Sequence, residues 1–451
     1  MVENIHILWR VLCRGEFGSV FFIGINKIKS TLQAGDNREL VISSALAFLI
    51  RMLGAFSGYV ATFFIARFLG AEESGYYFLA FSIVTVLAVF SGVGLENTVL
   101  RYIGARPACT VNVFNKSLII VLVMSSLSAG CLYFSADYVS LTIFNKRDLY
   151  PVLQSMSLGV VGLSILTIVA MVLQGLRRIP LSIWILNISV NLLLVVYIYS
   201  VKVSSAVILA SAYSLGAMLT AVVGVAAVFF LKPSVGHDSI SWQDIFASCL
   251  PLWIVAIMAQ LVQWSGQFAA GVYVDSNLVA LFTVAQRTAM LSSFVLIAVN
   301  LVVAPKFAAL HRQGNMLALE HLAIQSVKLI GLLAVPLVGL MLIFPSYLMG
   351  IFGDEYLAGA HLLRILAVGQ FVNAITGSVG FLLMMSGHER DMRNVTLISG
   401  GIALSLTWLL TAQYGITGAA VSTAIAVATQ NLLAVYYVKK RLGFNTLAVW
   451  R

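Results

Sequence analysis

The chain has 451 residues, of which 60% are hydrophobic and only 10% are charged, and its formal net charge is +10. Soluble domains carry about 25% charged residues, so a soluble fold of this length could not cover its surface with polar groups. The cations lie scattered in short segments between apolar runs, a pattern that indicates membrane topology and anionic lipid headgroups as partners and argues against nucleic acid.

Residues 1–40 come before the first long apolar run, and they mix aromatic residues with basic ones. The aromatic and basic residues are Trp9, Phe21, Phe22, Arg10, Arg14, Lys27 and Lys29. We predict that this segment is a basic tail on the cytoplasmic surface of the membrane, where aromatic rings and cations both find partners.

After this tail the sequence contains twelve apolar stretches, each long enough to cross a bilayer. A spanning helix needs about 20 mostly apolar residues, and continuous apolar runs without alternation predict helices and not a barrel. The predicted spans are 43–69, 76–95, 117–136, 151–174, 181–200, 205–231, 248–273, 278–304, 325–345, 357–385, 392–412 and 416–438. The predicted fold is therefore an all-α polytopic membrane protein with twelve transmembrane helices.

The distribution of lysine and arginine predicts the orientation of these spans. With the N-terminus in the cytoplasm, about three quarters of the 27 Lys and Arg residues fall on the inner side, as the positive-inside rule requires. Both termini are then cytoplasmic. The other cations lie outside the predicted spans or towards their ends, which leaves Arg51 and Arg287 as the cations placed inside spans.

The two halves of the sequence resemble each other at three places in the same order. Tyr77-Phe78-Leu79-Ala80 opens the second span and Phe282-Thr283-Val284-Ala285 the eighth; Gly175 and Gly387 lie in matching inner turns; Ala206 and Ala419 lie near the start of the sixth and twelfth spans. The partners are about 205–213 residues apart, which indicates a duplication. We predict two six-helix halves, 41–231 and 248–441, joined by a linker at 232–247 and followed by a cytoplasmic tail at 442–451.

The two arginines within spans are the first candidates for a functional site. A charge at the centre of a bilayer costs about 3 kcal/mol or more, so such residues are rare without a function. Arg51 lies about two turns into its span, and snorkelling to the headgroups explains it equally well. Arg287 lies deeper, which favours a role in the substrate path.

Amide side chains form a second group of candidates. Gln260, Gln263 and Gln267 follow at i, i+3 and i+7, a spacing that places them on one helix face. Amides in a water-filled cavity bind sugar hydroxyls, although bonds between helices, worth about 0.6–2 kcal/mol each, are the alternative. Asn300 is a further candidate, and Asn187, Asn191, Gln370 and Asn373 are weaker ones.

The sequence contains no pattern that predicts an enzyme, a cofactor site or a metal site. No P-loop, paired-carboxylate or Ser/His/Asp arrangement occurs, and the four cysteines form no close pair. No Asp or Glu lies in the middle of a predicted span.

Several short motifs resemble the polysaccharide and O-antigen flippases of the multidrug/oligosaccharidyl-lipid/polysaccharide exporter superfamily. They are Ala66-Arg67-Phe68-Leu69-Gly70, Gly75-Tyr76-Tyr77, Gly92-x-Gly94-Leu95, Arg101-Tyr102-Ile103 and, near the C-terminus, Gly415-x-x-Gly418-Ala419-Ala420. The resemblance covers about residues 40–440.

This resemblance implies a bundle like that of the multidrug and toxin extruders, and a non-enzymatic flippase without cofactor in the bacterial inner membrane. Its substrate would be an undecaprenyl-pyrophosphate-linked oligosaccharide, moved by alternating access, with a glycan polymerase or glycosyltransferases as candidate partners. Arginine would bind the pyrophosphate. Two alternatives remain open: a small-molecule or drug exporter of the same superfamily, and a membrane scaffold without transport. Antiporters of that superfamily usually need a buried carboxylate, which argues against the first.

Overall fold

The computed structural model describes residues 35–231 and 240–448, without the side chains of residues 35–49, Arg51, Pro251 and Leu301. The chain divides after Arg51 into two units, and all contacts given below lie within the second, Met52–Arg451. The described residues form helices and no strand. Ten of these helices are long and apolar enough to cross a membrane, so the protein is a multi-pass membrane protein.

The first half of the described chain runs from α3 to α9, with one short 3₁₀ helix and two π-helical segments, η2 (Val139–Ile143) and η3 (Trp184–Ser189). Its α-helices are α3 (Gly35–Ser91), α4 (Leu95–Ala105), α5 (Thr110–Tyr138), α6 (Leu149–Gly175), α7 (Ile179–Ile183), α8 (Val190–Val201) and α9 (Ala206–Phe230).

The second half runs from α10 to α17, with 3₁₀ helices η4 (Met290–Ser292) and η5 (Asp354–Gly359). Its α-helices are α10 (Trp242–Tyr273), α11 (Ser276–Ala289), α12 (Ser293–Arg312), α13 (Met316–Ile343), α14 (Pro345–Gly350), α15 (Ala360–Thr376), α16 (Val379–Met385) and α17 (Glu389–Leu442).

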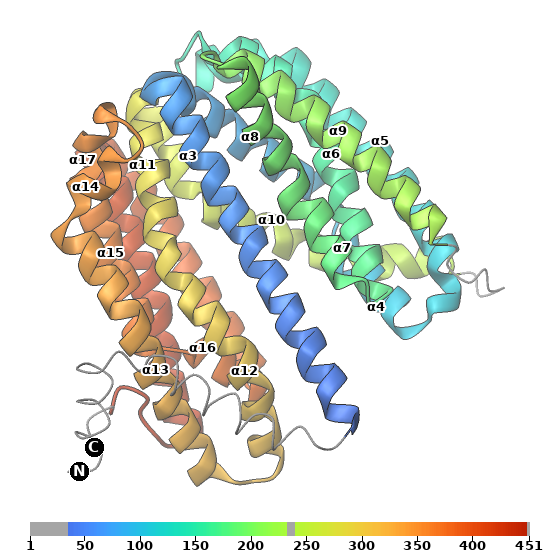
Figure 1. Ribbon diagram of the computed structural model, residues 1–451, viewed down its shortest axis with the longest axis vertical. Helices are drawn as coiled ribbons and strands as arrows, with labels where there is room; N and C mark the ends of the chain where they lie inside the picture. The colour runs from blue at the N-terminus through green and yellow to red at the C-terminus, as the bar shows by residue number, and fades with distance from the viewer. Residues whose placement is uncertain (1–34, 232–239, 449–451) are drawn as a thin grey trace. The chain divides into compact units, whose positions relative to one another are not determined.

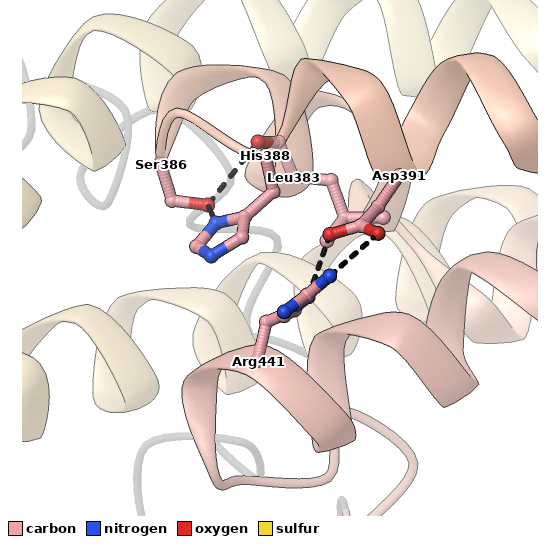
Figure 2. A network of polar contacts seen from close by, with 5 residues as sticks. All are labelled: Leu383, Ser386, His388, Asp391 and Arg441. Atoms are coloured by element: carbon pink, nitrogen blue, oxygen red, sulfur yellow. Dashed lines mark hydrogen bonds and ion pairs between the residues drawn. The ribbon is translucent and has the colours of Figure 1, made fainter.

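The long helix α17 is a hairpin that reverses at Gly415. This glycine has φ 58° and ψ −142°, outside the helical region. Thr407 Oγ1 donates to Ser422 Oγ at 3.0 Å across the bend, whereas fifteen residues of straight helix span about 22 Å. At the free ends of the hairpin, Arg441 binds both carboxylate oxygens of Asp391 at 2.7 and 3.0 Å (Figure 2).

Helix α3 is a hairpin as well, and it reverses at Gly70, which has φ 77° and ψ 176°. Arg287 of α11 contacts both Thr62, before the bend, and the ring of Phe78, after it. Sixteen residues of straight helix would separate these two side chains by about 24 Å. Because two of the ten long helices are hairpins, the described part of the chain contains twelve membrane-length helical segments, in agreement with the twelve crossings predicted from the sequence.

Two predicted spans are broken where the sequence predicted continuous helices. The span 278–304 contains η4, where Ser292 Oγ competes for the Ala289 carbonyl at 2.8 Å. The span 357–385 breaks at Gly377, whose φ is 69° and where an added Cβ would meet Val327 at 2.7 Å. Close packing and a left-handed backbone together require glycine here.

The two halves pack tightly at one end of the bundle, which we call the closed end. It carries the bend of α3, the turn between α10 and α11, and the segment from α14 to α15. Glu355 accepts the backbone N–H of Ala71 at 2.6 Å, and Tyr356 shares a 2.6 Å hydrogen bond with Ser74. The end carrying α4, α7, α12 and α16 is the opposite end (Figure 1).

The buried core shows that the halves are joined mainly at the closed end. One apolar cluster fills the first half and continues into the closed-end part of the second, where it includes Leu363 and Ala419. A separate cluster, with Val303, Leu382 and Val435, fills the rest of the second half. Towards the opposite end the halves therefore have separate cores, and the N-terminal part of α10 remains against the first half through Trp253, which donates to Phe90 O at 2.7 Å.

The bend at Gly415 gives a test of this fold. Gly415→Ala should lower the stability by about 1–2 kcal/mol, because only the left-handed backbone opposes a Cβ there and the nearest atom, Val274 Cγ1, lies at an ordinary 3.6 Å. Thermal unfolding of the purified protein measures the effect. The control is Gly401→Ala in the same helix, whose Cβ meets nothing within 4 Å. Equal melting temperatures for the two variants would contradict the assigned bend.

Candidate functional site

Arg287 lies at the centre of the candidate site, between the two halves. It is twelve residues past Asp275 at the start of α11, which places it about 18 Å from the closed end along the helix, near the middle of a bilayer. Its guanidinium donates to Thr62 Oγ1 in the arm of α3 that precedes Gly70. Thr62 itself is fully buried.

Two aromatic rings of the first half lie against this guanidinium, and two further rings pack on the second of them; we call these four rings the aromatic cage. Its carbon lies 5.4 Å from the ring centre of Phe78 and 5.9 Å from that of Phe81, both in the arm of α3 after Gly70. Phe81 in turn makes edge contacts with Tyr213 of α9, at 5.4 Å, and with Trp264 of α10, at 6.1 Å. Three helices besides α11 thus contribute to the cage.

The charge of Arg287 is not neutralised by a carboxylate. Among the described residues, the only ion pair within 4 Å is that of Asp391 and Arg441 (Figure 2). Two cation–π contacts, worth about 0.5–2 kcal/mol each, offset part of the cost of the charge. The bond to Thr62 uses one N–H, so the other donors are free to bind an anionic ligand with the forked geometry of arginine.

The predicted glutamine stripe of α10 divides into different roles. Gln267 is buried and donates to Phe78 O at 2.6 Å, so it joins the halves, while its own oxygen has no partner. Gln260 accepts from Trp264 at 3.0 Å and is half-buried, and Gln263 is exposed. The oxygen of Asn300 is buried without a partner. The side chain of Arg51 lies outside the described residues.

Sequence reasoning missed the aromatic cage and the contacts that hold the closed end. The sequence did contain a signal for the aromatic cage, because Tyr77, Phe78 and Phe81 bring aromatic rings to neighbouring positions of one helix. Lys146 gave no such signal: it lies in a loop and donates to Gly271 O of the other half at 2.6 Å. Burial lowers the pKa of Lys146.

A polar pocket of about 360 Å³ opens beside Lys146 at the closed end and is lined by both halves. Its walls are Glu72, Tyr76, Asn145, Lys146, Arg147, Asp275, Ser276 and Asn277. The pocket carries two cations and two carboxylates, so its charges balance, unlike the surroundings of Arg287.

Glu96 in the first turn of α4, outside the spans, gives a pH test. Burial raises its pKa, so the folded protein binds this proton more tightly than the unfolded chain does. Stability should rise as the pH falls from above this raised pKa towards the ordinary value of about 4.3.

Glu96→Gln should remove this rise in stability and should stabilise the protein at neutral pH. Melting temperatures from pH 7.5 to 4.5 measure this, with Glu389→Gln, at an exposed position, as the control; an unchanged pH profile in Glu96→Gln would contradict it.

Comparison with known proteins gives consistent matches over most of the chain. A family described as polysaccharide biosynthesis protein matches residues 40–311. The probable low-salt glycan biosynthesis flippase Agl15 of Haloferax volcanii is 24% identical over 416 residues, which cover 89% of this chain and 84% of that protein.

Two solved structures share the fold. An inward-facing multidrug resistance transporter of the MATE family superposes with a TM-score of 0.72 at 17% identity, covering 89% of this chain and 98% of that one. The lipid II flippase MurJ in an inward closed conformation superposes with a TM-score of 0.71 at 15% identity, and the match covers 88% of this chain and 87% of that one. At these identities the likeness confirms the predicted bundle and leaves the substrate undetermined.

Proposed function

Because this chain belongs to the polysaccharide biosynthesis protein family, we propose that it is a flippase for an anionic, lipid-linked glycan. The observation that carries this proposal is the uncompensated charge of Arg287, which lies between the two halves at mid-membrane depth. A phosphate or pyrophosphate headgroup needs such a donor inside the membrane, because it brings negative charge into a medium that solvates it poorly. The name of the Haloferax volcanii relative supports the same substrate class.

The cargo we propose is an oligosaccharide linked to undecaprenyl pyrophosphate, carried across the bacterial inner membrane. Arg287 binds the headgroup, and Gln260, Gln263, Gln267 and Asn300 line the path with it. Arg51 is a second candidate for the headgroup, nearer the cytoplasm. The excess of cations on one side supports a closed end that faces outward and two termini in the cytoplasm.

This arrangement supports alternating access as the mechanism of the proposed transport. The halves share a core at the closed end and have separate cores towards the opposite end, so a cargo enters from the cytoplasmic side. Opening of the closed end requires the contacts of Glu355, Tyr356 and Lys146 with the other half to break.

A deletion strain tests the function. We expect loss of the surface glycan, accumulation of its lipid-linked precursor on the cytoplasmic leaflet, and unchanged sensitivity to cationic drugs. Extraction of lipid-linked glycans and drug-resistance profiles measure these properties. Raised drug sensitivity with intact surface glycan would favour a small-molecule exporter, because a multidrug resistance transporter shares the same fold. No change in any of the three would favour a scaffold.

A further inference from the structure

Seven polar side chains lie in helices of both halves, on the opposite-end side of Arg287. We call this set the polar collar, and it consists of Ser57, Asn187, Asn191, Gln260, Ser293, Gln370 and Asn373. These residues come from α3, η3, α8, α10, α12 and α15. Each lies within a span, where unneeded polar groups are costly.

The first part of the collar is built on the π-helical segment η3. Ser57 donates to Asn187 O at 2.7 Å, and Asn191 donates to the same carbonyl at 2.7 Å and to Ser57 Oγ at 3.3 Å. Gly54 allows this approach, since an added Cβ would meet Asn187 at 3.1 Å. The side-chain amide of Asn187 is exposed and makes no hydrogen bond with any described residue, so it is available to bind a ligand.

The second part lies where two helices of the other half are broken. Gln370 Oε1 accepts from Ser293 at 2.9 Å and from Asn373 at 3.1 Å, between η4 and the break at Gly377. The exposed residues of α15, among them Arg364, Val368 and Phe371, follow one stripe. Gln370 is half-buried and points away from that stripe towards α12. Broken helices in membrane proteins commonly form binding sites in this way.

Helix geometry places these groups at one depth. Ser57 precedes Thr62 by five residues and Ser293 follows Arg287 by six, and the two helices run in opposite directions. Gln260 precedes Trp264 of the aromatic cage by four. At 1.5 Å per residue, all three lie about 6–9 Å from the Arg287 level, on the side away from the closed end.

We infer that the polar collar is the subsite for the sugar part of the cargo, one to two helical turns from the anion site at Arg287. Its members are neutral amides and hydroxyls, which pair with sugar hydroxyls as both donors and acceptors, whereas a phosphate needs the cation. The buried, unpartnered oxygen of Asn300, two turns beyond Ser293, extends the same face. This inference rests on the proposed function and specifies where each part of the cargo binds.

Binding of two probes to the purified full-length protein in nanodiscs tests the subsite. The probes are undecaprenyl pyrophosphate alone and undecaprenyl pyrophosphate that carries a short oligosaccharide. The wild type should bind the sugar-bearing lipid more tightly. Gln370→Leu and Asn191→Leu should each weaken that binding about tenfold and leave binding of the sugar-free lipid within about twofold. Gln154→Leu, which replaces an amide in α6 outside the collar, is the control.

The outcomes separate the collar from the proposed function. If the wild type binds both lipids equally well, the collar is not a sugar subsite while the flippase proposal stands, and this comparison does not depend on how any variant folds. If Gln370→Leu weakens the binding of both lipids equally, or the binding of neither, the collar inference is overturned. If the wild type binds neither lipid, the proposed function and the collar inference both fail.

Discussion

Replacement of Arg287 by alanine is expected to abolish glycan export while the protein still inserts into the membrane. The guanidinium is the one charged group that the structure places between the halves at this depth within the described residues, with its remaining donors free. Loss of a charge-assisted contact to a headgroup costs about 1.5–3 kcal/mol, which alone corresponds to roughly 10–100-fold in rate. Surface glycan and membrane-inserted protein are measured in the same cells.

Two further variants define what Arg287 contributes. Arg287→Lys keeps the charge and loses the forked geometry, so partial export is expected. Arg364→Ala removes an exposed arginine near the closed end, whose Nε donates to Leu342 O at 3.3 Å, and it should export normally. Normal surface glycan in Arg287→Ala would refute the assigned role.

Gly75→Val should force the closed end apart and stop transport. A Cβ at Gly75 would lie far inside the van der Waals contact distance of the Ser276 backbone oxygen. Backbone cannot rotate aside as a side chain does, so the helices of the two halves must separate. We expect loss of export and faster labelling of Asn277→Cys by a membrane-impermeant maleimide, in a protein whose four native cysteines are replaced.

The matched control is Gly339→Val in α13, where an added Cβ meets nothing within 4 Å. It should leave export and labelling unchanged. If Gly75→Val exports normally, then close contact of the halves at this point is not required in the transport cycle.

The sequence predicted the crossings well because each depends on a local property. A bilayer selects about 20 apolar residues in a row, and short turns between them are visible in the composition, as at Gly70 and Gly415. Arg287 was identifiable for the same reason, since a lone charge in an apolar run stands out. The duplication of the halves stays a prediction.

Only the tertiary structure decided which polar residues act together. Gln260, Gln263 and Gln267 look alike in sequence, yet Gln267 is occupied by a carbonyl of another helix and Gln263 is exposed. The break at Gly377 depends on Val327, fifty residues earlier in the chain. The cage around Arg287 and the polar collar join helices far apart in sequence, and contacts of this kind depend on packing that hydropathy and periodicity do not encode.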